Sequence, residues 1–385
     1  DDPAASRRYK LVDNVRTASM ELFAKFRGSP GRERLVPEAM GTDHLSSYHR
    51  LDTALEAVEL SLAAIEGRDE MIDHEKETVA TLRDELSRVM SQTVKGYVHW
   101  IENRKRSVIL GASPIDISHT LREGIFFSVP CVVLTSATLS TSGNFNFLKT
   151  RLGLDFDVTE LSLPSPFDFP NQACLYLPDH LPDPRETDFP QKLATEAQKL
   201  IRITKGGALF LFTSIRNMQS VHTLLEEHFA EPVLLQGTAP KSTLLTQFVQ
   251  NPHAVLCATA SFWQGVDVPG YALRLVIIDK LPFSSPGDPL TAARIDLLND
   301  QGHKAFIEYQ VPEAALFLKQ GFGRLIRTQH DRGIVSIMDK RLHTARYAKI
   351  FLDSLPNCPI LNDLEAVATW WNPDAPGSRR ENAES

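Results

Sequence analysis

The sequence has few cysteines, and their spacing does not suggest a metal site. The four of them are Cys131, Cys174, Cys257 and Cys358, with no C-x-x-C pair among them and no histidine at a zinc-binding distance along the chain. This pattern argues against a zinc site and leaves no place for an iron–sulfur cluster. We therefore expect buried, reduced thiols, which are typical of a protein in the reducing cytoplasm.

Long apolar runs and a strong positive charge are also absent. The longest apolar runs, "CVVLTSATL" and "LRLVII", are far shorter than the roughly 20 residues that span a bilayer, so we expect no membrane segment. With a net charge of -7, any contact with nucleic acid would come from a local groove. The first residues, "DDPAASRRYK", contain neither a methionine nor the apolar stretch of a signal peptide, and this suggests that the chain begins inside a longer protein.

The sequence does have enough length and hydrophobic content for more than one domain. It contains 385 residues, of which 42% are hydrophobic. In residues 9–103 apolar side chains such as Leu51, Leu55 and Val58 recur at spacings of three and four, which predicts amphipathic helices with almost no strand. Residues 1–106 could form a small helical subdomain or a coiled-coil arm for interactions.

From Ser107 onward, short apolar runs alternate with helical stretches. Seven runs are interpreted as buried strands: "CVVLTS", "CLYLP", "ALFLFTS", "PVLLQG", "AVLCAT", "LRLVIID" and "GIVSIMD". This alternation predicts an α/β fold with a doubly wound parallel sheet, whose functional residues follow the carboxyl ends of strands. We assign residues 107–157 to the end of a first α/β domain and residues 158–372 to a second one, and we expect the polar tail 373–385 to be disordered.

The segment "QGFGRLIR" contains side chains that suit a phosphoryl group. Gln320, Arg324 and Arg327 have the spacing that would place them on one face of a helix. Guanidinium groups bind phosphate oxygens in pairs and keep their charge, so the two arginines are candidates for arginine fingers. The alternative is an ordinary pair of solvated arginines.

The segment "SFWQGVDVPG" follows the predicted strand "AVLCAT". Gly265 would allow the backbone to approach a ligand closely, and Asp267 could bind a ribose hydroxyl or orient an arginine, unless the segment is only a turn with a capping aspartate. Ser261, Phe262 and Trp263 are candidates for contacts with nucleic acid, in which the aromatic rings would stack on bases. Aromatic residues after a core strand could equally pack inside the protein.

Hydroxyl side chains follow two other predicted strands. Thr213 and Ser214, after "ALFLF", suit the phosphate oxygens of a nucleic-acid backbone, or could cap the next helix. Thr135, Ser136 and Thr138 of "TSATL" could bind a neighbouring loop and so link nucleotide state to domain closure. Local bonds between these side chains and the backbone are the alternative.

Together with "DKLPFSSPGDPL", these segments resemble motifs III to VI of the DinG and XPD family of superfamily 2 DNA helicases. "DKLPFSSPGDPL" is the most specific and points to the bacterial branch that includes DinG and YoaA. The resemblance is clear over about residues 107–355, and the helical region before them resembles the Arch insertion more loosely. It implies RecA-like domains and ATP-driven, 5'-to-3' movement along single-stranded DNA, often with an iron–sulfur cluster in the first domain.

The resemblance also implies roles for particular residues and partners. Gly265 and Asp267 would belong to motif V at the nucleotide cleft, and Gln320, Arg324 and Arg327 to motif VI, which contacts the γ-phosphate. The intact protein would use ATP and Mg²⁺, bind single-stranded or forked DNA, and work in replication or repair, where a further protein partner would be expected. No membrane is involved.

The sequence departs from the family in what it lacks. It contains no G-x-x-x-x-G-K-[ST] loop and no DEAH sequence, so the residues that hold the phosphates and Mg²⁺ are missing. Gln264 stands where several family members have glutamate. One explanation covers the missing motifs and the missing cluster cysteines: they would precede Asp1, and the chain alone would be inactive as an ATPase.

Two other function classes remain open at this stage. The first is a non-catalytic module that binds DNA or a protein partner with the same fold; it has no physical need for two arginines and a glutamine on one face. The second is a small-molecule α/β enzyme, for which the sequence offers no nucleotide fingerprint and no catalytic dyad.

Overall fold

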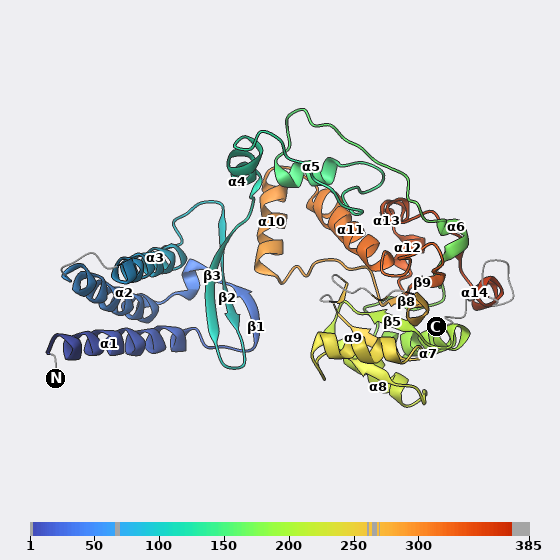
Figure 1. Ribbon diagram of the computed structural model, residues 1–385, viewed down its shortest axis with the longest axis horizontal. Helices are drawn as coiled ribbons and strands as arrows, with labels where there is room; N and C mark the ends of the chain where they lie inside the picture. The colour runs from blue at the N-terminus through green and yellow to red at the C-terminus, as the bar shows by residue number, and fades with distance from the viewer. Residues whose placement is uncertain (1–2, 66–69, 260–261, 264–267, 269, 372–385) are drawn as a thin grey trace. The chain divides into compact units, whose positions relative to one another are not determined.

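The computed structural model describes residues 3–65, 70–259, 262–263, 268 and 270–371 (Figure 1). Two compact units make up the chain. Residues 1–119 and 284–305 form the first unit, and residues 120–283 and 306–385 form the second. The tail 373–385, where we expect disorder, lies outside the described residues. In the described part, no helix is long and apolar enough to cross a membrane.

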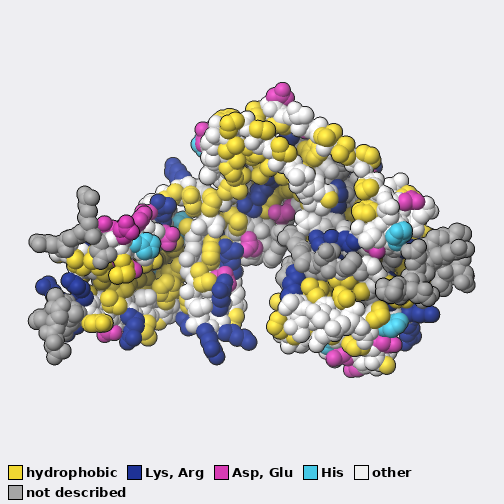
Figure 2. Space-filling model, viewed as in Figure 1, with side chains coloured by type: hydrophobic (Ala, Val, Ile, Leu, Met, Phe, Trp, Pro, Cys, Tyr) yellow, Lys and Arg dark blue, Asp and Glu magenta, His cyan; other side chains and the backbone are white. Residues whose placement is uncertain are grey.

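The first unit packs helices against one face of a small antiparallel sheet. Its helices are α1 (Pro3–Lys25), α2 (Thr42–Ala63) and α3 (Glu70–Ser91), and its strands are β1 (Gly31–Arg34), β2 (Tyr97–Asn103) and β3 (Val108–Pro114), in the order β1-β2-β3. Leu22, Leu51 and Met90 from the helices meet Ile101 of β2 in a common core. In Figure 2, Lys and Arg side chains gather around the end of the sheet where β2 turns into β3.

The other face of this sheet carries α10 (Pro289–Asp300), which comes from far along the chain. Asp288 caps α10 by accepting the amides of Leu290 at 3.1 Å and Thr291 at 3.0 Å. The same carboxylate forms an ion pair with Arg32 of β1 at 3.4 Å. Part of the segment "DKLPFSSPGDPL" therefore builds the first unit.

The expectation of almost no strand in residues 9–103 was wrong, because β1 and β2 both lie in this range. β1 has the sequence "GRER" and all four residues are exposed, so it carries no apolar signal. Its partner, β2, lies more than sixty residues later and pairs Gly31 with Asn103. Strands this short and polar depend on pairing rather than on local pattern. The predicted helical periodicity is confirmed, since Leu51 and Leu55 of α2 are buried.

The second unit contains a seven-stranded parallel sheet in the order β10-β4-β9-β8-β5-β7-β6. The strands are β4 (Ala173–Tyr176), β5 (Ala208–Leu211), β6 (Val233–Leu235), β7 (Val255–Ala258), β8 (Leu275–Ile278), β9 (Gly333–Ile337) and β10 (Ile360–Leu361). Six of the seven predicted strands are confirmed by β4 to β9. β10, at the edge, has only two residues and was not predicted.

Helices cover both faces of this sheet, as predicted for a doubly wound fold. One face carries α7 (Phe189–Thr204), α8 (Ile215–Glu226) and α14 (Leu364–Trp371), and the other carries α9 (Lys241–Gln250), α11 (Val311–Phe322) and α13 (Ala348–Ser354). Alternate residues of β8 enter the two cores: Leu275 and Ile277 on one face, Val276 and Ile278 on the other. The remaining short helices are α4 (Ser118–Leu121), α5 (Asn146–Leu152), α6 (Phe169–Gln172) and α12 (Arg341–Thr344).

The predicted strand "CVVLTS" does not form. Residues 131–136 have no regular structure and are exposed, with 79% of the surface of Val133 accessible. Cys131 is exposed as well, so the expectation of a buried thiol was wrong at this position. A strand exists only where neighbouring backbone satisfies its N–H and C=O groups, and none of the described chain pairs with this segment.

Candidate nucleotide and nucleic-acid site

Asp279 ties together the carboxyl ends of β5 and β8. Its Oδ1 accepts the backbone amides of Thr213 at 3.0 Å and Lys280 at 2.8 Å, and its Oδ2 accepts the Thr213 hydroxyl at 3.3 Å. The carboxyl group is fully buried, and this loss of water raises the pKa of Asp279 to about 7. Asp279 was not predicted from the sequence as a site residue, although it stands at the end of the predicted strand "LRLVIID".

Ser214 acts as the N-cap of α8. Its side chain accepts the amide of Asn217 at 3.4 Å, which confirms the capping alternative for this residue. Thr213 donates its hydroxyl proton to Asp279, so the hydroxyl is already engaged within the protein. The next exposed side chains in the first turn of α8 are Ile215 and Arg216. Arg216, which the sequence analysis did not single out, is the cation nearest in sequence to this cap.

A second buried carboxylate, Asp339, organises the neighbouring strand end. It follows β9 and is 1% exposed. Its Oδ2 accepts the amide of Leu281 at 2.8 Å, and its carboxylate pairs with the Arg341 guanidinium at 2.6 Å. The segment after β8 is thereby held to the end of β9. Two buried aspartates, Asp279 and Asp339, thus fix the carboxyl edge of the sheet.

Phe262 and Trp263 are core residues. Phe262 is 1% exposed and Trp263 is fully buried, where its ring stacks on Phe317 of α11 at a centroid distance of 4.8 Å. A Cβ added to Gly321 would lie 2.9 Å from the Trp263 ring, so α11 approaches the indole directly. Neither ring has an exposed face for a base, and the expectation of base stacking is corrected to core packing. Ser261 lies outside the described residues.

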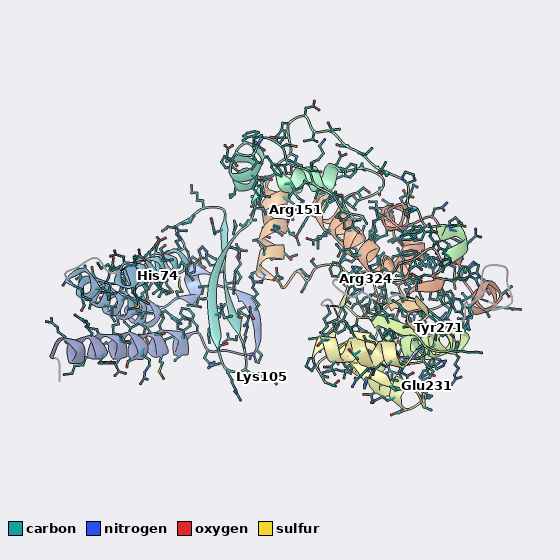
Figure 3. The ribbon with its side chains drawn as sticks, in the orientation of Figure 1. His74, Lys105, Arg151, Glu231, Tyr271 and Arg324 are labelled. Carbon is teal, nitrogen blue, oxygen red and sulfur yellow. The ribbon has the colours of Figure 1, made fainter. Side chains whose placement is uncertain are left out.

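The prediction that Arg324 and Arg327 share a helix face was wrong. α11 ends at Phe322 with Gly323 as its C-cap, so Gln320 is helical while Arg324 lies in the turn beyond the helix (Figure 3) and Arg327 in the following loop. Nε of Arg324 donates to the carbonyl of Gln320 at 3.2 Å. Glycine at positions 321 and 323 weakens the helix at this point, which the spacing argument ignored.

Asp331 and Gln172 hold the loop that carries these arginines. Oδ2 of Asp331 accepts the backbone amides of Arg327 and Thr328, both at 2.7 Å. Nε2 of Gln172 donates to the carbonyls of Thr328 at 3.0 Å and Asp331 at 2.9 Å. Arg324 and Arg327 are half-buried on this fixed loop. Neither of the two supporting side chains was predicted from the sequence.

The hydroxyls of "TSATL" form local bonds. Ser136 Oγ accepts the amide of Thr138 at 3.1 Å and lies 3.2 Å from its hydroxyl, and Thr135 is exposed. This is the local alternative considered for the motif. Shortly after it, however, the chain contacts the helix that carries Gln320: Nζ of Lys319 donates to the carbonyl of Ser140 at 3.5 Å.

Gly265, Asp267 and Gln264 lie outside the described residues, so their expected places at a nucleotide cleft stay predictions. The cysteines do not fit an iron–sulfur cluster. Burial raises the pKa of Cys174 and Cys257 well above the usual range and that of Cys358 to about 11, so these thiols are protonated at neutral pH. Among the described residues, no three potential metal-ligating side chains of His, Cys, Asp or Glu come together.

Comparisons with known proteins agree with this fold. Residues 197–358 match the family described as "Helicase C-terminal domain". The chain is 38% identical over 318 residues to the ATP-dependent DNA helicase YoaA of Haemophilus influenzae, covering 83% of this chain and 49% of that protein. It is also 38% identical over 266 residues to the ATP-dependent helicase DinG of Mycobacterium tuberculosis, covering 67% and 40% of the two chains.

A solved structure titled "XPD_APO" shares the fold. It superimposes with a TM-score of 0.57 at 14% identity, over 92% of this chain and 68% of that one. The chain spans about half the length of the curated relatives it matches. The doubly wound sheet of the second unit is RecA-like. The resemblance to the C-terminal part of the DinG/XPD-like superfamily 2 DNA helicases is therefore confirmed, since residues 197–358 match a helicase C-terminal domain and the chain is similar in sequence to YoaA and DinG helicases.

Proposed function

We propose that this chain is the C-terminal part of an ATP-dependent DNA helicase that moves 5'-to-3' along single-stranded or forked DNA in replication or repair. It would contribute arginines to the nucleotide cleft and part of the DNA groove. The observation that carries the proposal is the loop of Arg324 and Arg327, which Asp331 and Gln172 fix through four hydrogen bonds.

An arginine finger requires a loop whose conformation is already fixed. Transfer of a phosphoryl group is accelerated when cations are already in position, because little reorganisation is then required. Asp331 and Gln172 bind only backbone atoms of the loop, so these four hydrogen bonds fix its shape without using the guanidinium groups. ATP and Mg²⁺ would be held mainly by parts of the intact protein that this sequence does not contain, since it has no phosphate-binding loop.

Lys319 and Ser140 support a coupling role for the segment after "TSATL". Lys319 is adjacent to Gln320 and reaches back to the carbonyl of Ser140, and burial lowers its pKa below the usual range. Ser142 is anchored as well, since its amide donates to Ser354 Oγ at 3.0 Å. A displacement of the "TSATL" segment would therefore be transmitted to α11 and from there to the arginines.

The DNA groove would include the start of α8. Helix N-termini bind phosphates through free amides and a positive dipole, and α8 begins beside Thr213 and Ser214 with the exposed Arg216 in its first turn. The buried Asp279 holds this strand end in place. The groove accordingly depends on backbone amides and Arg216 more than on the two hydroxyls.

An exposed apolar segment supports the idea that the intact protein contains more of the first domain. Val133, Leu161 and Leu163 are 79%, 73% and 74% exposed. Large apolar side chains that are this exposed often mark a surface that another part of the protein covers. We infer that upstream residues of the intact protein would pair with residues 131–136 and complete a sheet there.

The test is DNA-stimulated ATP hydrolysis by the intact protein. Arg324→Ala and Arg327→Ala should each reduce the rate by a factor on the order of 10³ or more, while nucleotide binding changes little. Arg346→Ala is the control, because Arg346 is an exposed arginine of the same unit with no described contact. The 385-residue chain alone should show no turnover. Full activity in both arginine variants would refute the role of the loop.

A further inference from the structure

The hairpin between β2 and β3 ends in three consecutive basic residues. Arg104, Lys105 and Arg106 are all exposed, and the turn is closed by the amide of Arg104, which donates to the carbonyl of Ser107 at 2.9 Å. Figure 3 shows Lys105 at the free end of the hairpin, where Figure 2 shows basic side chains gathered on the surface. This tip belongs to the first unit, away in sequence from every helicase motif.

A fourth cation supports the turn from behind. The guanidinium of Arg27 donates to the carbonyls of Arg104 at 3.3 Å and Arg106 at 3.5 Å. The buried Asn103 docks the base of the turn on the end of α1: its Oδ1 accepts the amide of Gly28 at 2.9 Å and its Nδ2 donates to the carbonyl of Phe26 at 3.2 Å. The turn is therefore ordered before any ligand arrives, which lowers the entropy lost on binding.

The charges at this tip are poorly balanced. Glu102 pairs with Arg104 at 2.5 Å, and within the described residues no carboxylate forms an ion pair with Lys105 or Arg106. Four cations thus face a single carboxylate in a chain whose net charge is -7. Such a local concentration of positive charge attracts a polyanion, and a nucleic-acid backbone releases counterions when it binds.

The residue types indicate which polyanion fits. Surfaces that bind single strands combine cations with exposed aromatic rings on which bases stack. The turn, residues 104–107, contains no aromatic residue, and the ring of the nearby Trp100 is covered by the Arg32 guanidinium at 3.8 Å. Cations without a stacking platform suit a duplex, whose bases are already stacked inside and whose phosphates line the outside.

We propose that the tip formed by Arg27, Arg104, Lys105 and Arg106 binds the phosphate backbone of double-stranded DNA, independently of base sequence. The proposal rests on the proposed function only in taking DNA as the partner. It adds a second contact, on a different unit from the arginine loop and the start of α8. Lys105 and Arg106 are its main contact residues, because Arg104 is paired with Glu102 and Arg27 holds the turn.

The test measures binding of the 385-residue chain to a fluorescent 20-base-pair duplex and to the matching single strand by anisotropy, over a series of salt concentrations. For the duplex, Lys105→Ala/Arg106→Ala should weaken binding about ten-fold at low salt and reduce the slope of log Kd against log salt by about 2. Affinity for the single strand should change less. Both side chains are exposed on a turn, so an unchanged thermal melt should confirm that the fold is intact.

Arg7→Ala/Arg8→Ala provides the matched control. It removes the same charge from the same unit, roughly 25 Å away along α1, and should leave duplex binding within about two-fold of the parent. Unchanged duplex binding in the hairpin variant, an equal loss in the control, a larger loss for the single strand, or no duplex binding by the parent chain would each overturn the proposal. The proposed function is tested separately by ATP hydrolysis in the Arg324 and Arg327 variants, so the two can fail independently.

Discussion

The amide of Thr213 lies 3.0 Å from Oδ1 of Asp279, a fully buried carboxyl group that receives three hydrogen bonds where β5 and β8 end. Burial outweighs these bonds and raises the pKa of Asp279 to about 7. The folded state therefore prefers the protonated carboxyl between the unfolded pKa near 4 and the folded pKa. The stability of the second unit should consequently depend on pH in a window set by this one residue.

We expect the free energy of unfolding to fall as pH rises from about 4 to about 7, because the unfolded chain releases the proton of Asp279 earlier than the folded chain does. Asp279→Asn cannot ionise and keeps an oxygen for the amides of Thr213 and Lys280. It should remove this slope and be more stable than the parent at pH 7, by on the order of 2 to 4 kcal/mol. Urea denaturation at pH values from 5 to 8 measures the free energy of unfolding of both proteins, and Asp300→Asn, at an exposed position, is the control. The same slope in parent and Asp279→Asn would contradict the assignment.

Removal of the carboxylate that holds the arginine loop should destabilise the loop. Asp331→Ala leaves the amides of Arg327 and Thr328 without their acceptor, which should cost about 1 to 3 kcal/mol. Asp331→Asn retains one oxygen that can accept both amides, so most of the stability should remain. Hydrogen exchange at these two amides, followed for both variants, separates the outcomes; equal protection in Asp331→Ala and the parent would show that other contacts hold the loop.

Arg274 provides a further prediction at the amino ends of the strands. The side chain is 2% exposed and donates to the backbone carbonyls of Thr204, Lys205, Tyr271 and Pro252. Arg274→Met would remove these four hydrogen bonds, although the Lys205 carbonyl keeps its contact with His253 Nδ1 at 2.6 Å, and should lower the free energy of unfolding by about 3 to 5 kcal/mol. Arg274→Lys should recover only part of this loss, because an ammonium group cannot reach all four carbonyls.

The control for this prediction is Arg202→Met, which removes an exposed arginine of the same unit. Chemical denaturation monitored by circular dichroism should show a change of less than about 0.5 kcal/mol for it. If Arg274→Met changed the free energy of unfolding equally little, the four hydrogen bonds would contribute little net stability.

The parts of the fold that repeat a local pattern could be predicted from the sequence. β4 to β9 are short, mostly apolar runs that are buried along their whole length except for the half-buried β6, and α2 shows regular apolar spacing, so each of these elements can be recognised within a few residues. The antiparallel sheet of the first unit could not be predicted, because "GRER" becomes a strand only by pairing with Asn103 and its neighbours. The strand prediction for residues 131–136 was wrong for the opposite reason: their apolar pattern is strand-like, but no described segment pairs with them.

The candidate site was predicted by residue type more reliably than by geometry. The spacing of Arg324 and Arg327 suited a helix face, but two glycines end α11 between Gln320 and Arg324. Of the side chains that fix the site, Asp331 binds amides three and four residues before it, whereas Gln172 binds backbone carbonyls more than 150 residues later in the sequence and leaves no motif. Such partners become visible only when the fold brings them together.

Gly321 is the position at which the core and the candidate site meet. A Cβ there would lie 2.9 Å from the buried Trp263 ring, so Gly321→Ala should force α11 away from the indole and cost about 1 to 3 kcal/mol. Gly323→Ala is the control, because its nearest neighbour would be the carbonyl of Lys319 at 3.4 Å, and it should be almost neutral. Denaturation of each variant gives the comparison.

Trp263→Phe introduced into the Gly321→Ala background should restore part of the lost stability, because the smaller ring leaves room for the added methyl group. Alone, Trp263→Phe should be destabilising through the cavity that it creates. The coupling energy between the two substitutions should therefore be favourable, by about 0.5 to 3 kcal/mol. If the two changes in the free energy of unfolding were strictly additive, Gly321 would be required for the helix end itself. In that case the close packing of α11 on Trp263 would not set the position of the arginine loop.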